Sequence, residues 1–392
     1  MNKDKRIIIV GAGSTGSSVA YHLSKITDSE IILIEKRGIG SGMTAFSSAI
    51  VRTHYSNEIV AKMALESRHI FESNRENLGF YRTGMITIVP DSLKDRMEEN
   101  VSMLKGLGIN EQNLTEHEAS RKFPWINFDE GEDISYEIDS GYADSVLTAN
   151  NFAKNAIDSG VKFIRDDVYK IENEQGRGKV VLKDGKIITG TKVVLCTNVW
   201  TNKLLSRSGF GEEELLPIKV SPHPVILFKR PNTISGLLPI VSDLVDKDYY
   251  KFEGESLLSG GNLRSELDNT NIDPDNPPLE VPMDYVSDYA ERISKRIPDM
   301  KEAGFHSAYY GMYDNTPDFH PIIDSLTSLG LPNVYCCVGL SGHGFKLSPA
   351  LGRIVSNLIM DKKDPALGYF RLLRFKNGNS VFKNYEGIGT VG

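Results

Sequence analysis

Three glycines near the start of the chain have the spacing of a dinucleotide-binding turn. Gly11, Gly13 and Gly16 follow the apolar run Ile7–Val10 directly. In such a turn the first glycine permits the tight bend, the second lets the backbone approach a pyrophosphate, and the third lets helix and strand pack closely. Glu35 ends a second apolar run, where a carboxylate can accept ribose hydroxyls. The pattern predicts a dinucleotide site, and it leaves FAD and NAD both open.

A second glycine-rich turn, Gly339–Lys346, lies directly before a helix predicted from Ser348 to Met360. The N–H groups at a helix N-terminus lack intrahelical partners, and the helix dipole places partial positive charge there. The same turn carries an imidazole, His343, and an amine, Lys346. We therefore expect negative charge on a bound group to be stabilised at this turn.

The elements that position these turns alternate between strand and helix. Residues 7–34 have the strand, helix and strand of a β-α-β unit of the usual ~30 residues. Short continuous apolar runs of this kind are typical of parallel strands covered on both faces. The alternation resumes later, with a helix at 148–159, a β-hairpin at 180–189, and strands at 161–164, 192–196 and 334–338. The sequence therefore predicts an α/β fold in which two domains are interleaved.

The segments between these elements have a different pattern. We predict a long helix at 57–78, a strand at 85–89 and a helix whose apolar face includes Leu93 and Leu104. Thr115–Glu118 has the spacing of a capping box. Residues 217–320 are richer in proline, aromatic residues and alternation, which predicts an antiparallel sheet.

Composition excludes several classes of function. The 392-residue chain has a net charge of -7 and no dense Lys/Arg tract, which argues against a nucleic-acid partner. No stretch approaches the ~18 to 20 apolar residues of a membrane span. The three cysteines, Cys196, Cys336 and Cys337, lie in apolar runs. An odd number with two adjacent predicts reduced thiols and a cytoplasmic protein. We predict no metal site.

Several segments together resemble the FAD-dependent amino-acid oxidase superfamily. Within it they are similar to the sarcosine oxidase and glycine oxidase branch, including the beta-subunit type of sarcosine oxidase and proline dehydrogenase. The similar segments span nearly the whole chain in the family's order and are Gly11–Tyr21 with Glu35–Arg37, Ser47–Arg52 with Tyr55, Thr197–Trp200, Met312–Asp318 with Pro321–Asp324, and Gly339–Lys346.

The resemblance implies a fold with two domains. An FAD-binding Rossmann-like domain of the glutathione-reductase type would be discontinuous, formed by residues 1–80, 145–215 and 325–370. An inserted α+β substrate domain, built on an antiparallel sheet, would comprise residues 81–144 and 216–324. Residues 371–392 would form a C-terminal tail.

The resemblance also implies which residues bind FAD. ADP would lie on the first β-α-β unit, with Val168 offering backbone hydrogen bonds to adenine, and the flavin ring would lie at the domain boundary. The assigned residues are Gly11, Gly13, Ser14, Thr15, Gly16, Glu35, Lys36, Arg37, Thr44, Ser48, Val168, Thr197, Asn198, Trp200, Gly339, Gly342, His343, Gly344, Phe345 and Lys346.

Two departures from the family pattern carry expectations. Monomeric sarcosine oxidases attach FAD through a cysteine, and this chain has Gly311 at that position, so we expect non-covalent FAD. The same enzymes place a lysine over the flavin to speed reaction with oxygen. The corresponding stretch here, Glu255–Gly260, has no lysine, although Lys251 is a few residues away. Without that lysine, an acceptor other than oxygen and a dehydrogenase subunit are expected.

The resemblance implies hydride removal from the carbon beside the nitrogen of a small amino acid such as sarcosine, another N-methylated glycine, proline or glycine. Arg52 and Lys346 would hold the substrate carboxylate, by a bidentate guanidinium contact and a point charge. His343 would lie near flavin and substrate and tune the local charge, and Tyr313 would line the substrate pocket. For His343 a purely structural role as a helix cap, and for Tyr313 a place in the core, stay open.

Three other functions stay open on the sequence. A 2-hydroxy-acid or glycerol-phosphate dehydrogenase on the same fold would need a base for the alcohol proton. An FAD-holding electron-transfer subunit of a larger complex would need partner subunits. An NAD-dependent enzyme would be colourless. The pair Arg52 and Lys346 argues against an empty substrate site.

Overall fold

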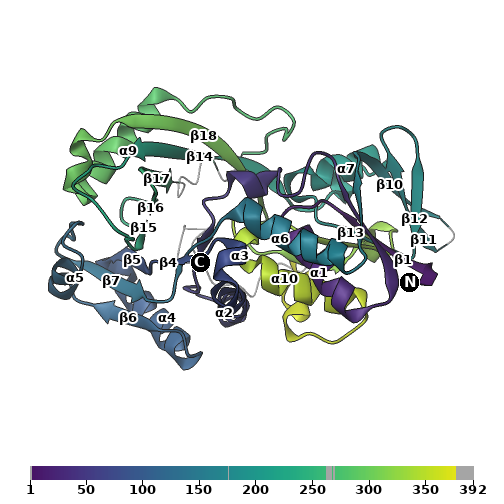
Figure 1. Ribbon diagram of the computed structural model, residues 1–392, viewed down its shortest axis with the longest axis horizontal. Helices are drawn as coiled ribbons and strands as arrows, with labels where there is room; N and C mark the ends of the chain where they lie inside the picture. The colour runs from purple at the N-terminus through teal and green to yellow at the C-terminus, as the bar shows by residue number, and fades with distance from the viewer. Residues whose placement is uncertain (1, 175, 262–266, 268–269, 377–392) are drawn as a thin grey trace.

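The computed structural model describes residues 2–174, 176–261, 267 and 270–376. Two lobes, each built around its own sheet, lie side by side in Figure 1. The first lobe contains β1 and helices α1, α6 and α10, and the second contains the long strands β14 and β18. Within the described residues, no helix is both long and apolar enough to cross a membrane.

The first lobe is organised by a six-stranded sheet in the order β19-β20-β13-β1-β2-β9. The five adjacent strands from β20 to β9 run parallel to one another, and β19 is antiparallel to β20. The predicted parallel strands are therefore confirmed. Their bounds are Asn2–Val10 for β1, Ser29–Glu35 for β2, Lys162–Arg165 for β9, Lys192–Leu195 for β13, Ile322–Ser325 for β19 and Val334–Val338 for β20.

Alternate residues of this sheet face two different layers. Ile7 and Ile9 of β1 pack against helices α1 (Ser14–Ile26), α2 (Glu58–Ser73), α6 (Ser145–Asp158) and α10 (Gly344–Ile359). Ile8 and Val10 face a three-stranded sheet and helix α7. Coverage on both sides explains why the strand is apolar at every position. The elements of that second layer are β10 (Val168–Glu174), β11 (Arg177–Leu182), β12 (Ile187–Gly190) and α7 (Thr201–Arg207).

The second lobe is built on an eight-stranded sheet in the order β18-β14-β17-β16-β15-β5-β7-β6. The antiparallel sheet predicted for residues 217–320 is present, but β15 runs parallel to β5 and joins it to β7 and β6. The bounds are Met85–Pro90 for β5, Glu111–Leu114 for β6, Glu132–Glu137 for β7, Lys219–Lys229 for β14, Ile240–Asp243 for β15, Asp248–Glu253 for β16, Ser256–Gly261 for β17 and Phe305–Asn315 for β18. The helix α9 (Met283–Arg296), which the sequence did not predict, packs on this sheet.

Shorter elements join the lobes. A small sheet has the order β3-β8-β4, and α4 and α5 flank β6. Thr115 caps α5 through the predicted capping box. The bounds are Ile50–Val51 for β3, Tyr81–Arg82 for β4, Gly141–Tyr142 for β8, Arg75–Leu78 for α3, Lys94–Gly106 for α4 and Glu116–Lys122 for α5.

Three helix boundaries differ from the predictions. The single helix predicted at 57–78 is divided at Asn74, whose backbone leaves the helical conformation. Helix α6 begins at Ser145 because Asp144 accepts a hydrogen bond from Leu147 N–H and caps it. Helix α10 begins at Gly344, four residues before the predicted start, and contains Pro349 in its second turn. Lys346 therefore lies inside the first turn of α10.

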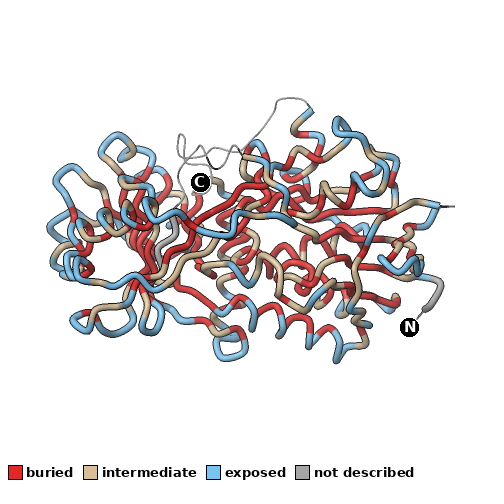
Figure 2. The backbone as a smooth tube through the Cα atoms, turned by 90° about the horizontal axis from the view of Figure 1, so that it is seen from above, coloured by how far each residue is buried: buried red, intermediate tan, exposed pale blue. Residues whose placement is uncertain are grey.

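The chain after β18 returns to the first lobe. Residues 322–324, which the sequence assigned to the substrate domain, pair with β20, and residues 371–375, which it assigned to the tail, pack beside them. Residues 377–392 of that tail lie outside the described residues. Figure 2 shows buried backbone running through both lobes, with exposed backbone mainly at the loops around them.

Candidate functional site

At two positions of the first glycine-rich turn there is no space for a side chain. Gly11 has a φ of +98°, and a Cβ there would lie 2.4 Å from the Cys196 carbonyl oxygen. A Cβ at Gly16 would lie 1.9 Å from the carbonyl oxygen of Gly11. At Gly13, by contrast, a Cβ would meet only the Thr44 hydroxyl, at 3.0 Å. The first and third glycines therefore serve the fold, whereas the second leaves the backbone open toward the pocket.

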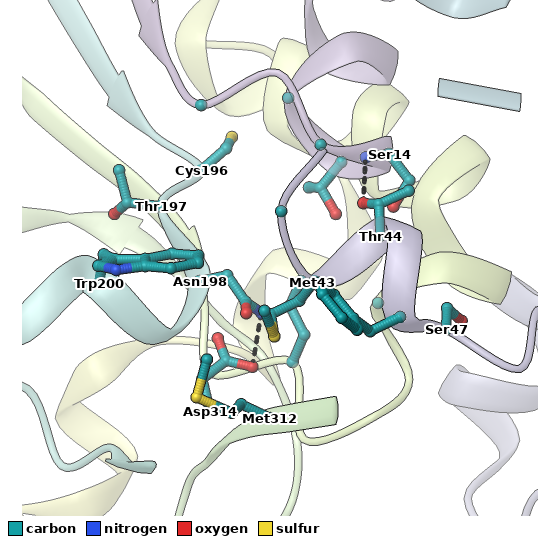
Figure 3. A pocket seen from close by; sticks show the side chains of 18 of the residues that line it. Ser14, Met43, Thr44, Ser47, Cys196, Thr197, Asn198, Trp200, Met312 and Asp314 are labelled. Atoms are coloured by element: carbon teal, nitrogen blue, oxygen red, sulfur yellow. Dashed lines mark hydrogen bonds between the residues drawn. The ribbon is translucent and has the colours of Figure 1, made fainter. Parts of the chain in front are cut away.

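One elongated pocket starts at this turn and ends at the second glycine-rich turn. Figure 3 shows side chains from several separate segments of the chain around it, among them Thr44, Asn198 and Met312. Of the residues that the sequence assigned to cofactor and substrate, those lining the pocket are Gly11, Gly13, Ser14, Thr15, Gly16, Glu35, Lys36, Arg37, Thr44, Ser48, Val168, Thr197, Asn198, Trp200, Tyr313, Gly342, Gly344, Phe345 and Lys346. Arg52, Gly339 and His343 are not among the lining residues, although Arg52 and His343 are close to Lys346, which is.

At one end of the pocket, Glu35 orders the turn. One of its carboxylate oxygens accepts a hydrogen bond from Ala12 N–H at 2.9 Å, and the other accepts one from Arg37 N–H at 3.1 Å. A carboxylate oxygen has more than one lone pair. Glu35 therefore keeps acceptor capacity toward a ligand in the pocket, as the sequence predicts for a ribose.

Trp200 covers the same end from the side. Its indole Nε1 donates a hydrogen bond to Asp275 at 2.8 Å, and the Lys36 ammonium lies 4.0 Å from the ring centroid. Asp275 also pairs with Lys203 at 2.5 Å. Thus a loop of the second lobe meets the first lobe over this end of the pocket, a contact that sequence reasoning missed because Asp275 lies in no motif.

Midway along the pocket, Asp314 connects three segments. Its carboxylate accepts hydrogen bonds from Asn198 Nδ2 at 2.9 Å, drawn in Figure 3, and from Gly339 N–H at 2.6 Å. Burial raises the pKa of Asp314 to about 6. Gly339, which the sequence assigned to the cofactor, does not line the pocket, and a Cβ there would lie 2.4 Å from the Thr316 side chain.

At the far end, two cationic side chains and a histidine gather at the start of α10. Lys346 is partly buried and lines the pocket, and its ammonium donates to the Gly342 carbonyl at 3.3 Å. Burial and the nearby charge of Arg52 lower the pKa of Lys346 well below its usual value. Burial, followed by the charges of Lys346 and Arg52, likewise lowers the pKa of His343. The imidazole is therefore neutral at pH 7.

Tyr55 joins Arg52 to this cluster. The Arg52 guanidinium lies over the Tyr55 ring, 4.2 Å from its centroid, and the Tyr55 hydroxyl is 3.0 Å from His343 Nδ1. From the sequence, Tyr55 was identified only as part of a segment that is similar to the amino-acid oxidase superfamily, with no role of its own. The cluster brings together residues that are about 290 positions apart in the chain. It also holds two basic side chains, whose positive charge the carboxylate of a ligand would neutralise.

The wall of the pocket on the side of the second lobe is aromatic. The rings of Tyr313 and His223 are stacked, with centroids 3.7 Å apart. A Cβ at Gly342 would lie 2.7 Å from the Tyr313 ring, so this ring packs closely on the second glycine turn. Burial lowers the pKa of His223 to about 3, which keeps it neutral. His223 lies on β14 without any motif around it, and sequence reasoning missed it.

The two predicted departures from the family pattern can be placed. Gly311 lines the pocket, and a Cβ there would lie 3.6 Å from the Phe46 carbonyl oxygen. Lys251 is buried on β16, where its ammonium donates to the Ser48 carbonyl at 2.8 Å and pairs with Glu253 at 2.6 Å. Lys251 therefore lies behind Ser48, which lines the pocket. The side chains of residues 258–260 lie outside the described residues.

Comparisons with known proteins agree with this geometry. The model of the family described as FAD dependent oxidoreductase matches residues 6–358. The chain is 24% identical over 407 residues to FAD-dependent oxidoreductase domain-containing protein 1 of Xenopus laevis, covering 91% of this chain and 79% of that protein. It is 26% identical over 394 residues to the peroxisomal sarcosine oxidase of Mus musculus, covering 94% and 95%. The crystal structure of L-proline dehydrogenase from P. horikoshii has a TM-score of 0.85 at 24% identity, covering 97% of this chain and 100% of that one.

Proposed function

Because the chain belongs to the family of FAD-dependent oxidoreductases, we propose that it oxidises the C–N bond of a small amino acid whose nitrogen is secondary or N-methylated. The names of two similar proteins support this choice, since one is a sarcosine oxidase and the other an L-proline dehydrogenase. Sarcosine and proline are both secondary amines with a carboxylate on the neighbouring carbon. The observation that carries the proposal is the buried Arg52 next to the partly buried, pocket-lining Lys346, both beside a neutral His343.

The pocket fits FAD on geometric grounds. It is open at Gly13, where the backbone N–H groups at the start of α1 can meet a pyrophosphate. It ends at the start of α10, whose first turn includes Lys346. The residues that would hold the cofactor are the lining residues named above. Bound FAD supplies the hydride acceptor of the reaction.

The protein's own groups would orient the substrate. A guanidinium and an ammonium can hold one carboxylate from two sides, which fixes the direction of the neighbouring carbon. The same two positive charges disfavour a protonated amine close to them. They would therefore lower the pKa of the substrate ammonium and favour the free amine, the form from which a hydride can leave.

Anaerobic mixing with a panel of substrates tests this proposal. The purified holoenzyme would be mixed with sarcosine, proline, glycine and the matching 2-hydroxy acids while flavin absorbance is recorded. We expect bleaching by secondary amino acids and none by hydroxy acids. Bleaching by hydroxy acids alone would contradict the proposal and favour an alcohol dehydrogenase. Recovery of colour in air, compared with an artificial acceptor, then distinguishes an oxidase from a dehydrogenase.

The variant Arg52→Ala tests the carboxylate anchor. We expect about a 10- to 100-fold higher substrate requirement for bleaching, because a charge-assisted hydrogen bond is lost. FAD content should not change. The exposed Arg121 on α5 offers a matched control, since Arg121→Ala removes a guanidinium far from the pocket. Unchanged bleaching of Arg52→Ala at low substrate would remove Arg52 from the site.

A further inference from the structure

We propose that two buried acids of the second lobe, Glu111 and Glu137, are positioning residues that hold Arg52 in the direction needed to bind the substrate carboxylate. The inference rests on the proposed function in one respect, namely that Arg52 is the carboxylate anchor. Neither acid lies in one of the short motifs on which the family resemblance rests, and both come from strands far from Arg52 in the chain. They act through the segment Thr53–Tyr55.

Glu137, the last residue of β7, holds the backbone of this segment. Its carboxylate accepts hydrogen bonds from Thr53 N–H at 2.9 and 3.0 Å and from His54 N–H at 3.1 Å, and it also accepts one from the Thr53 hydroxyl. Both Glu137 and Thr53 are buried. Because two consecutive N–H groups point at one carboxylate, the conformation of the chain directly after Arg52 is defined by Glu137.

Glu111, the first residue of β6, holds the His54 side chain of the same segment. It lies 2.6 Å from His54 Nδ1 and accepts a hydrogen bond from Ser135 Oγ at 2.7 Å. Burial opposes ionisation of Glu111, but the charge and hydrogen bond of His54, with Ser135 and Arg52, outweigh it and lower the pKa of the acid. Glu111 is therefore an anion that pairs with the imidazole.

Arg52 is oriented by the atoms that these acids fix. Its guanidinium donates to the carbonyl oxygen of His54, the residue whose N–H is bound by Glu137 and whose ring is bound by Glu111. The same guanidinium stacks on Tyr55, which contacts His343 at the start of α10. A shift of the segment would therefore turn the guanidinium away from Lys346.

Stability alone does not account for two carboxylates at this place. Burial and the nearby charge of Glu111 raise the pKa of Glu137, so a negative charge at this place is costly. Well-packed apolar residues often serve a core as well as buried ions or better. At the paired ends of β6 and β7, where Glu111 lies opposite Glu137, an apolar pair would avoid that cost. The acids are instead placed where they bind the one segment that carries Arg52, which is the arrangement that a positioning role requires.

Glu111→Gln and Glu137→Gln in the FAD-loaded protein test the inference, with acetate as a probe that has a carboxylate and no amine. Acetate binding is followed by the change in the flavin absorption spectrum and by calorimetry, and sarcosine reduction is followed under anaerobic conditions. We expect the Kd for acetate and for sarcosine to rise about tenfold or more, whereas the limiting rate of reduction stays within about threefold, because orientation of the anchor changes and the chemistry does not.

Glu132→Gln is the matched control. Glu132 lies on the same strand β7 and is bound to Arg296, so its loss disturbs a buried ion pair at the other end of the strand. It should lower the thermal stability and leave both Kd values unchanged. His54→Asn is a second variant, because its amide nitrogen can replace Nδ1 as a donor to Glu111. We expect it to bind acetate more tightly than His54→Leu.

The outcomes are distinct. Kd values of Glu111→Gln and Glu137→Gln within twofold of wild type, with a lower melting temperature, would overturn the inference and leave the acids a structural role. If Glu137→Gln does not fold, Glu111→Gln and the His54 pair decide alone. A wild-type protein that binds acetate but is not reduced by any amino acid would sink the proposed function, and the acetate series would still decide the positioning role. Absence of acetate binding by a wild-type protein that sarcosine reduces would overturn the positioning role alone and leave the proposed function standing.

Discussion

Lys346 is the residue whose chemistry depends most on its surroundings. Its side chain is partly buried at the start of α10, close to Arg52 and to the neutral His343. A helix N-terminus and a second cation both oppose its positive charge. A carboxylate ligand would reverse this balance. The pocket therefore places a lysine at a cost in stability, and an anionic substrate offsets that cost.

Replacing this lysine tests the trade between stability and binding. The unfolded chain keeps the lysine proton up to its usual pKa near 10.5, whereas the folded protein loses it at a lower pH. The wild-type protein should therefore gain stability as pH rises through this window, because the unfolded state binds more protons. Lys346→Met should remove that slope and raise the unfolding free energy at pH 7 by about 1 to 2 kcal/mol.

The measurement is denaturant unfolding at pH 7 and pH 9 with saturating FAD, since bound cofactor contributes to stability. Acetate binding to Lys346→Met should be lost. A variant that is less stable than wild type at pH 7 would contradict the assigned electrostatic cost.

Gly311 predicts how the cofactor is retained. A glycine offers no sulfur for attachment, and the three cysteines are buried in or beside the strands of the first lobe. We expect acid precipitation to release all flavin into the supernatant and to leave a colourless pellet. Colour that stays with the protein would show a covalent bond and would require attachment elsewhere. The absorbance of the two fractions gives the ratio directly.

At the scale of elements, the site depends on two helix N-termini that face one pocket. Helix α1 follows β1, and α10 follows β20, two strands away in the same sheet. Parallel strands place their carboxyl ends at one edge, and the helices that follow them start there. The turn after β1 can approach this closely because Gly11 and Gly16 allow the strand and the helix to touch.

Alanine substitutions at two glycines of this turn should have different effects on folding and on FAD binding. Gly16→Ala places a methyl group against the Gly11 carbonyl, so α1 must move, and we expect loss of FAD together with several kcal/mol of stability. Gly13→Ala meets only a hydroxyl, so the apoprotein should fold while FAD affinity falls about tenfold or more.

Gly38→Ala is the control, since nothing lies within 4 Å of the added Cβ. Thermal unfolding of the apoproteins and FAD titration by fluorescence separate the two effects. Equal losses of FAD affinity in all three variants would contradict the separate roles.

For the whole molecule, the chain that follows α10 completes the first lobe. Arg374 forms a buried pair with Asp318 at 2.8 Å, and its guanidinium also donates to the His320 carbonyl at 2.8 Å. Asp318 accepts a further hydrogen bond from His320 N–H. Residues 371–375 thus hold the loop between β18 and β19, beside the glycine turn that ends the pocket.

Arg374 and Arg371 should differ strongly in their contribution to stability. Arg374→Ala removes the guanidinium that pairs with the buried Asp318 carboxylate, which should cost about 3 to 5 kcal/mol. Arg371 pairs with Asp324 at the surface, with 40% of its side chain exposed, so Arg371→Ala should cost about 0 to 1 kcal/mol. Denaturant unfolding with saturating FAD measures both, and equal costs would disprove the distinction.

Local requirements explain what the sequence by itself determined. The positions of Gly11 and Gly16 follow from contacts within one β-α-β unit, and the apolar runs of β1, β2, β13 and β20 follow from burial on both faces. These features need only near neighbours, so spacing and composition were sufficient to predict the dinucleotide site and the parallel sheet, whereas the family and FAD followed from the resemblance of several segments.

Only the tertiary structure decided the contacts between remote segments. Glu111 and Glu137 meet at neighbouring positions of β6 and β7, and both reach a segment more than fifty residues earlier in the chain. His223 meets Tyr313 because β14 pairs with β18. A carboxylate or an imidazole in a strand has no local pattern that distinguishes a surface position from a buried one. Its partner is defined by strand order and register, which depend on the packing of the entire sheet.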